Sequence, residues 1–301
     1  MIKKTLYFGN PAYLSLKNAQ MVFSVPDGES PPRTFPIEDL GIVILDNRQI
    51  TITHGLMERL LDNNCAVITC DSAHMPTGLF LPLDGNTLQS ERFRAQIDSS
   101  KPLKKQLWQQ TVKAKIANQA RALNKCVPGC ETGNMAAWAA EVRSDDNTNL
   151  EGRAAAYYWR NFFPEQTDFR RDRESDGANT LLNYGYAILR AVVARALVGS
   201  GLLPTLGIHH HNRYNAYCLA DDVMEPYRPF VDVLVKDIVR KHGTPEELTT
   251  ELKRELLSIP VIDVNISRKK RPLMVAVEIT TASLAKCFMG QTKRILYPTL
   301  Q

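Results

Sequence analysis

The 301-residue chain lacks an uninterrupted apolar run of membrane-spanning length. The best candidate, Ala187–Val198, is broken by Arg190 and Arg195, whereas a spanning helix needs about 20 predominantly apolar residues. The N-terminus has two lysines but no apolar segment behind them, so it is not a signal peptide. We therefore expect a soluble, cytoplasmic protein with no membrane partner.

Several motifs of common enzyme classes are also missing. The sequence has no G-x-S-x-G nucleophile motif and no H-E-x-x-H zinc motif. Cys126 and Cys130 enclose Val-Pro-Gly and suggest a metal knuckle, but no second cysteine or histidine pair follows at zinc spacing. We interpret the six cysteines as free thiols, as is usual in the cytosol.

What is present is a globular composition whose hydrophobic pattern changes near residue 85. Before that point, the apolar runs are short, rich in β-branched and aromatic residues, and separated by Gly, Pro, Asn and Asp. One short helical segment, Gly55–Leu61, interrupts them. The predicted strands are Thr5–Phe8, Gln20–Phe23, Gly41–Leu45, Gln49–Thr53, Ala66–Cys70 and Gly78–Leu81.

After residue 85 the apolar period is helical. We predict helices over Ala178–Leu197 and Met274–Phe288, and one that starts at an N-cap Thr244 followed by Pro245. A further helix presents an apolar face made of Leu103, Leu107, Val112, Ile116, Ala120 and Leu123. The predicted fold is α+β, with a small N-terminal β domain (1–84) and a larger all-α domain (85–301).

Positive charge is concentrated in the predicted helical domain, although the net charge is only +5. The segment 101–125 holds seven basic residues and no acidic one, whereas an ordinary exposed helix mixes both signs. Arg170, Arg171 and Arg173 form a cluster diluted by acidic neighbours. Clustered cations suit a nucleic-acid backbone, although each cluster alone is also typical of a solvated surface. The DNA-binding candidates are Lys101, Lys104, Lys105, Lys113, Lys115, Arg190 and, in a predicted loop, Arg268, Lys269, Lys270 and Arg271.

Histidines and acids concentrate between residues 207 and 229. Three histidines, His209 to His211, follow a Gly-Ile step at a predicted helix start, and Asp222 and Glu225 lie three residues apart on one helix face. Two carboxylates and an imidazole that converge can bind Mg²⁺ or Mn²⁺. Glu151, flanked by small residues and aromatics, is a candidate ligand from another helix. Taken singly, each feature also fits a helix cap or a charged surface.

These segments together resemble the CRISPR-associated integrase and endonuclease of the adaptation module, the Cas1 family, and its type II branch most closely. The resemblance runs along nearly the whole chain and rests on the order and spacing of its pieces. They are Ile50-Thr-Ile-Thr-His54, Leu150-Glu-Gly-Arg153, Leu181-Leu-Asn-Tyr-Gly-Tyr186, Leu206-Gly-Ile-His-His210, Leu219-Ala-Asp-Asp-Val-Met-Glu-Pro-Tyr-Arg-Pro229 and Gln291-Thr-Lys-Arg294.

The resemblance implies a metal site on Glu151, His210 and Glu225, with Asp222 as a supporting acid. The histidine triplet leaves the register open to His209 or His211, and Asp222 could share the role of Glu225. The resemblance also implies a homodimer, two of which flank a dimer of a small ferredoxin-like partner subunit in a heterohexamer. It implies double-stranded and branched DNA as partners, and an association with the type II effector nuclease.

The implied activity is insertion of short foreign DNA fragments as new spacers into a CRISPR array. The reaction is a transesterification in which a DNA 3′-OH attacks a phosphodiester, assisted by a divalent metal ion. Two alternatives from other classes remain open at the level of sequence. One is a non-catalytic DNA-binding scaffold, and the other is a metal-dependent hydrolase of a small phosphate ester, which would not need a long basic track.

Overall fold

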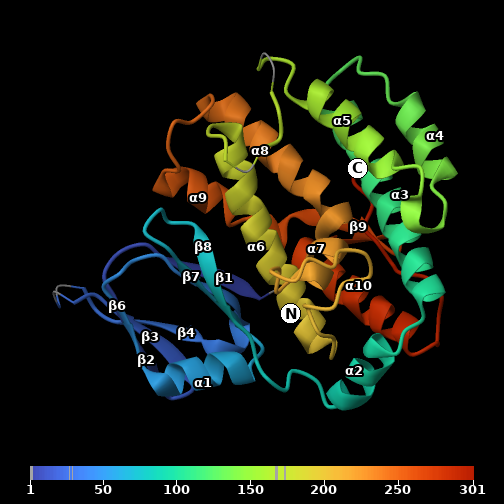
Figure 1. Ribbon diagram of the computed structural model, residues 1–301. Coiled ribbons are helices and arrows are strands. Elements are labelled where there is room, and N and C mark those ends of the chain that lie inside the picture. Colours follow the sequence, from blue (N-terminus) through green and yellow to red (C-terminus); the bar gives the residue numbers. More distant parts are fainter. Residues whose placement is uncertain (1–2, 27, 29, 167–168, 173) are drawn as a thin grey trace. The chain divides into compact units, whose positions relative to one another are not determined.

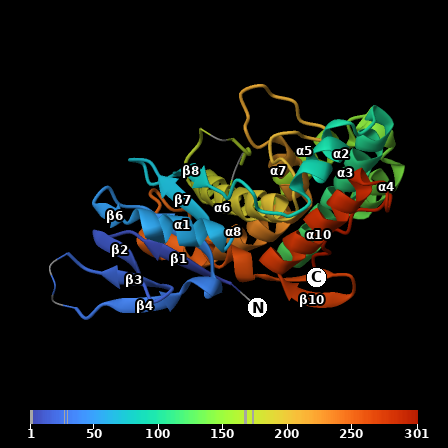
Figure 2. The same ribbon diagram turned by 90° about the horizontal axis from the view of Figure 1, so that it is seen from below.

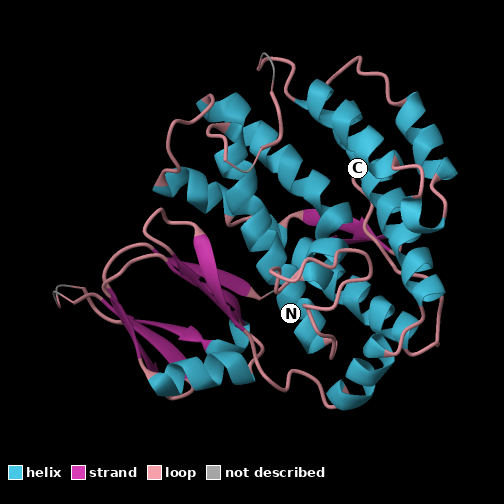
Figure 3. Ribbon diagram, in the orientation of Figure 1, coloured by secondary structure: helices cyan, strands magenta, loops and turns pink. Residues whose placement is uncertain are grey.

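The computed structural model describes residues 3–26, 28, 30–166, 169–172 and 174–301. Two compact units make up the chain, Met1–Thr87 and Leu88–Gln301. The first holds two β-sheets and the second is mainly helical (Figures 1 and 3). The predicted α+β class, with a small β part followed by a larger helical part, is confirmed.

The first sheet has the strand order β1 (Lys4–Phe8), β5 (Leu40–Leu45), β7 (Ala66–Cys70) and β8 (Pro76–Phe80). The first three strands run parallel, and β8 is antiparallel to β7. Strand β5 has the sequence Leu-Gly-Ile-Val-Ile-Leu and is almost wholly buried, because a central parallel strand is covered on both faces. Leu40 and Val43 of β5 and Val67 of β7 belong to the core of this unit, together with residues from the neighbouring strands and the helix at 54–62.

The second sheet has the order β4 (Arg33–Pro36), β3 (Gln20–Ser24), β2 (Ala12–Lys17) and β6 (Ile50–Ile52) (Figure 2). Helix α1 (His54–Asp62) buries Leu56 and Leu60. All six predicted strands and the predicted helix are present, and β2 and β4 are additional. The β2–β3 hairpin escaped prediction because Asn18 and Ala19 turn it, both with positive φ, where a turn signal usually contains glycine.

The helical unit begins with α2 (Gln89–Ile97), α3 (Lys101–Cys126), α4 (Gly133–Glu141), α5 (Leu150–Phe162) and α6 (Ala178–Gly199). It continues with α7 (Cys218–Met224), the short 3₁₀ turn η3 (Glu225–Tyr227), α8 (Arg228–His242), α9 (Thr250–Leu256) and α10 (Leu273–Phe288). Helix α6 packs against α8 and α10. It is long and apolar enough to cross a membrane, but 83% of its most apolar window is buried inside the protein, as in a core helix.

Three predictions about this unit need correction. The helix expected from Thr244 begins at Thr250, because the side chain of Thr249 caps it by accepting from the Leu252 N–H. The histidine triplet lies in a loop, and the next helix starts at Cys218. The basic run at 268–271 is not a loop: strands β9 (Asp263–Ile266) and β10 (Lys269–Pro272) form an antiparallel hairpin, so the unit is not all-α.

Candidate active site

Glu151 lies in the first turn of α5, where the local sequence fixes the helix start. Asn149 adopts a left-handed conformation and its side chain accepts from the Gly152 N–H at 3.2 Å. Asp146 accepts from the N–H groups of Leu150 and Glu151, at 3.0 and 2.8 Å. These acceptors satisfy N–H groups that a helix start leaves open, so the position of Glu151 in the first turn of α5 is fixed.

Glu225 lies where α7 gives way to η3. Pro226 follows it, and the Asn118 side chain on α3 donates to the Pro226 carbonyl at 2.8 Å. The Glu225 carboxylate is buried, and its Oε1 forms an ion pair with the Arg228 guanidinium at 2.9 Å. Burial alone would raise the pKa of Glu225, but Arg228 and Lys115 outweigh it and hold the pKa below its usual range.

Lys115 joins the two glutamates. Its Nζ lies 2.6 Å from Oε1 of Glu151 and 2.6 Å from Oε2 of Glu225. Burial disfavours the charged ammonium, but Glu225 and Glu151 outweigh this and raise the pKa of Lys115. Two carboxylates from different helices therefore meet around one cation.

His210 reaches the same region from the loop before α7. Its Nδ1 lies 2.5 Å from Oδ1 of the fully buried Asp222. Since a carboxylate only accepts, Nδ1 carries the proton and Nε2 remains the available ring nitrogen. The hydrogen bond to Asp222 is the main cause that raises the pKa of His210, and the charges of Glu225 and Glu151 add to it.

Asp222 also shapes the loop that carries His210. It accepts from the backbone N–H groups of Ile208, His209 and His210, at 2.7, 2.9 and 3.3 Å. Gly207 is required beside it, because a Cβ there would lie 2.3 Å from the His210 carbonyl oxygen and 2.8 Å from Asp222 Oδ2. Both oxygens of Asp222 are thus occupied by this loop.

The neighbouring histidines have other surroundings. His209 stacks on Trp108 of α3 with ring centroids 4.2 Å apart, and its Nδ1 is 3.9 Å from Asp145. His210 meets the same indole edge-on. His211 is exposed. Of the triplet, His210 is thus the member whose ring is oriented by a buried carboxylate.

The residues fit a divalent cation by chemistry, although their ligand atoms are not drawn tightly together. Among the described residues, only His242, Glu251 and Glu255 bring three such atoms within 4.8 Å of one another, and Lys241 pairs with that exposed group. At the predicted site, Oε2 of Glu225 is buried and has no hydrogen-bond partner beyond its contact with the Lys115 ammonium. A carboxylate oxygen that is buried without a hydrogen-bond donor is stabilised by a nearby cation.

A pocket of about 430 Å³ opens beside His210. Lys104 and Arg213 line it together with His211, Asn212 and Asn215. Cationic and amide side chains next to the imidazole suit an anionic ligand with many acceptor oxygens, such as a phosphate backbone.

Most of the basic candidates divide into two groups, while Lys104 and Lys113 are partly buried. Lys101, Arg268, Lys269 and Arg271 are exposed. Others are engaged within the protein: Lys105 pairs with Asp145 at 2.7 Å, Arg190 with Asp221 at 2.7 Å, and Lys270 with Asp263 at 2.9 Å. Lys115 departs most from the expectation, because it is buried against two carboxylates and does not face solvent. Arg173 lies outside the described residues.

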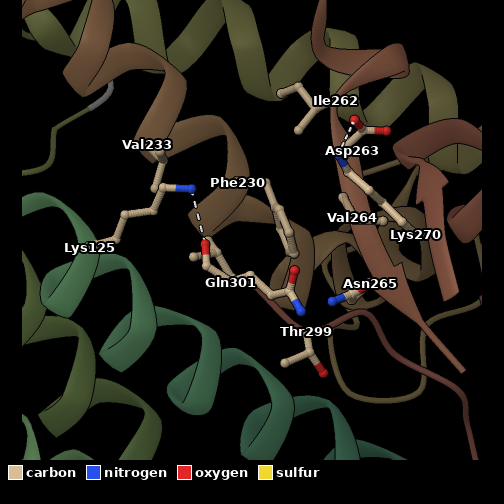
Figure 4. A pocket seen from close by; sticks show the side chains of 11 residues that line it. Lys125, Phe230, Val233, Ile262, Asp263, Val264, Asn265, Lys270, Thr299 and Gln301 are labelled. Atoms are coloured by element: carbon tan, nitrogen blue, oxygen red, sulfur yellow. Dashed lines mark hydrogen bonds and ion pairs between the residues drawn. The ribbon is translucent and has the colours of Figure 1, made fainter. Parts of the chain in front are cut away.

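A second pocket has a volume of about 280 Å³. Phe230, Val264 and the final residues of the chain line it (Figure 4). Lys125 donates to the Gln301 carbonyl at 3.0 Å there, and Lys270 faces Asp263. Its two lysines are thus already engaged. None of the residues proposed as metal ligands lines this pocket.

Sequence reasoning missed the parts played by Lys115, Trp108 and Arg228. The sequence does contain a signal that Lys115 is buried. Lys115 lies three residues after Val112 and four after Thr111, which places it on the buried side of α3. A lysine on an apolar face needs a carboxylate partner, which this helix lacks. The total charge of the helix hides this signal, because it counts every lysine alike.

Fold and site together define a class of protein with an N-terminal β unit, a helical unit and a carboxylate–histidine cluster on the latter. The family model described as "CRISPR associated protein Cas1" matches residues 6–259. The chain belongs to the Cas1 family, which confirms the resemblance found in the sequence.

Individual relatives agree with this assignment. The CRISPR-associated endonuclease Cas1 of Neisseria meningitidis serogroup C (strain 8013) is 35% identical over 283 residues, which cover 94% of this chain and 91% of the relative. A casposase bound to integration product has a TM-score of 0.78 and 19% identity, covering 98% of this chain and 92% of that one. A Cas6-RT-Cas1–Cas2 complex has a TM-score of 0.75 and 21% identity, covering 97% of this chain and 35% of that one. The two structural likenesses show the shared fold.

Proposed function

We propose that this protein is a divalent-metal-dependent DNA endonuclease and integrase that inserts short DNA fragments into a CRISPR array. The carrying observation is that Glu151 and Glu225, from different helices, converge on one cation beside an imidazole oriented by a buried aspartate. The name of the Neisseria relative supports the endonuclease activity. The likeness to a casposase that is bound to its integration product supports the integrase activity.

Glu151, Glu225 and His210, through Nε2, would hold Mg²⁺ or Mn²⁺. A bound divalent ion supplies Lewis-acid assistance, which makes the attacking 3′-OH more acidic and stabilises charge at the scissile phosphate. Carboxylate oxygens suit either ion, and the imidazole is better tolerated by Mn²⁺. Because the DNA 3′-OH is itself the nucleophile, transesterification requires none from the protein.

Asp222 has a positioning role in this proposal. It fixes the tautomer and the direction of the His210 ring, as carboxylates behind ligating histidines commonly do. Its oxygens are occupied by the loop, so we favour Glu225 over Asp222 as the acidic ligand from this segment.

Binding of double-stranded or branched DNA would use Lys104 and Arg213 near His210, and the exposed cations Lys101, Arg268, Lys269 and Arg271 farther along the unit. The Cas6-RT-Cas1–Cas2 likeness supports a Cas2-type partner subunit. We also propose that the protein is a cytoplasmic homodimer. It would form a heterohexamer with that ferredoxin-like partner and contact the type II effector nuclease.

Strand transfer and cleavage on branched and duplex DNA test the function, with Mn²⁺ or with EDTA. Wild type is compared with Glu151→Ala and with Glu141→Ala, an exposed glutamate at the end of α4. We expect Glu151→Ala to lose at least about 100-fold in rate while it still binds DNA, because it removes a ligand of the catalytic ion. Glu141→Ala should behave as wild type.

The assay must include the Cas2-type partner, so that inactivity is not caused by its absence. Equal strand transfer in Glu151→Ala and wild type would contradict the proposed site. Salt-sensitive DNA binding with no cutting or joining in any metal would instead favour the non-catalytic scaffold.

A further inference from the structure

The cation that contacts both Glu151 and Glu225 is the ammonium of Lys115, a residue of the protein itself. We propose that Lys115 is a built-in counter-ion of the active site: its ammonium neutralises Glu151 and Glu225 and competes with a divalent cation for the same two carboxylates. This inference rests on the proposed metal site and adds a residue that tunes its affinity. Lys115 would thus be a positioning residue and not a DNA contact.

The position of Lys115 makes this role specific. Its side chain is 11% exposed and lies on the buried side of α3, with Glu151 from α5 on one side and Glu225 from η3 on the other. An ammonium contact at 2.6 Å is longer than the roughly 2.0–2.1 Å of a Mg²⁺–oxygen bond. The Lys115 ammonium thus already contacts both candidate ligands. For Mg²⁺ to bind both carboxylates, their oxygens would have to move closer together.

The two oxygens of Glu225 meet different cations. Its Oε1 lies 2.9 Å from the Arg228 guanidinium, and its Oε2 lies 2.6 Å from the Lys115 ammonium. The oxygen that contacts Lys115 is therefore not the one that pairs with Arg228. Arg228 can keep the carboxylate in place while Oε2 changes its cation.

The charge balance sets the direction of the effect. Lys115 and Arg228 carry two positive charges, and Glu151 and Glu225 carry two negative charges. A divalent ion added to this balanced group is repelled by the ammonium at short range in a partly buried setting. Removing the ammonium leaves the carboxylates under-compensated and should tighten metal binding.

The test is a Mn²⁺ titration, followed by the electron paramagnetic resonance signal of free Mn²⁺. The proteins are wild type, Lys115→Met, Lys115→Arg, Glu151→Gln and Lys113→Met as a control on the same helix. We expect Lys115→Met to bind Mn²⁺ at least about tenfold more tightly than wild type. Lys115→Arg, which keeps the charge, should gain nothing, and Lys113→Met should match wild type.

A second readout is thermal unfolding in EDTA and in Mn²⁺. Lys115→Met should melt below wild type in EDTA, because Glu151 and Oε2 of Glu225 then lose the Lys115 ammonium, and should gain more from Mn²⁺. If Lys115→Met does not fold in either condition, Lys115→Gln carries the same expectation. Unchanged or weaker Mn²⁺ binding after loss of the charge overturns the proposal, and so does an equal gain in Lys115→Arg.

Failure of the underlying metal site would look different. In that case Glu151→Gln would bind Mn²⁺ as tightly as wild type, whatever Lys115 does. If Mn²⁺ binding requires Glu151 but is not tightened by Lys115→Met, the proposed metal site is supported and only the counter-ion role of Lys115 is excluded.

Discussion

At the scale of single residues, the histidine triplet is resolved by its hydrogen bonds. All three histidines are exposed, but His210 has a buried carboxylate behind its ring and His209 stacks on Trp108. The resemblance to the family favoured His210, but three adjacent imidazoles left the register open to His209 or His211. A second residue twelve positions away, Asp222, makes them inequivalent.

This difference predicts three distinct alanine variants. His210→Ala should reduce strand transfer by at least about 100-fold, because it removes an oriented ligand of the proposed metal ion. His211→Ala should stay within about threefold, and His209→Ala should lower the melting temperature through lost stacking on Trp108. Strand-transfer rates and melting curves of the three variants check this ranking; equal losses in His210→Ala and His211→Ala would contradict it.

At the scale of elements, the β9–β10 hairpin combines strain with charge. Ser267 and Arg268 form its turn with φ of 51° and 63°, a conformation that usually selects Asn or Gly. An arginine at such a position costs stability, and here it carries an exposed cation of the proposed DNA surface. The sequence suggested a loop because it lacks those turn residues.

We expect Arg268→Gly to keep or raise the free energy of unfolding, by up to about 1 kcal/mol, since relief of strain exceeds the added chain entropy. The same variant should weaken DNA binding and reduce the slope of log affinity against log salt by about 0.9, the value for one phosphate contact. Ser267→Gly relieves similar strain without removing charge and is the matched control. An unchanged salt slope in Arg268→Gly would exclude Arg268 from the DNA surface.

At the scale of the whole helical unit, Asp232 ties three helices together. It lies buried on α8 and accepts from the hydroxyls of Tyr158 on α5, at 2.9 Å, and Tyr186 on α6, at 2.5 Å. Burial raises the pKa of Asp232 to about 7, although both tyrosines, Arg228 and Arg171 oppose the shift. Folding therefore takes up a proton at this site at mildly acidic pH.

The sign of the pH dependence follows directly. The pKa of Asp232 is higher in the folded state than the ordinary value of 3.8, so the unfolded chain releases this proton first as the pH rises. From pH 4 up to pH 7 the free energy of unfolding of wild type should fall relative to that of Asp232→Asn, by at most about 1.4 kcal/mol per pH unit. Urea unfolding at pH 5, 6, 7 and 8 measures the difference.

The control for this prediction is Asp237→Asn, an exposed aspartate on the same helix, which should keep the wild-type pH dependence. Parallel stability curves for wild type and Asp232→Asn would contradict a raised pKa in the folded protein.

The sequence by itself determined the division into a β part and a helical part, and the family. Alternating and helical periods identified six strands and the long helices, because local spacing decides which face of an element is apolar. The motifs around Glu151, His210 and Glu225 identified candidate ligands because their residue types are visible in the chain. Turns without glycine, at Asn18–Ala19 and Ser267–Arg268, were missed because their conformation depends on the strands they join.

Only the tertiary structure decided what these residues do for one another. It separated His210 from its neighbours through Asp222, and it turned Lys115 from a member of a basic run into the partner of two glutamates. Such roles depend on side chains that meet from distant parts of the chain. Charge counted along a helix does not reveal which face a lysine takes, and burial beside a carboxylate changes its chemistry.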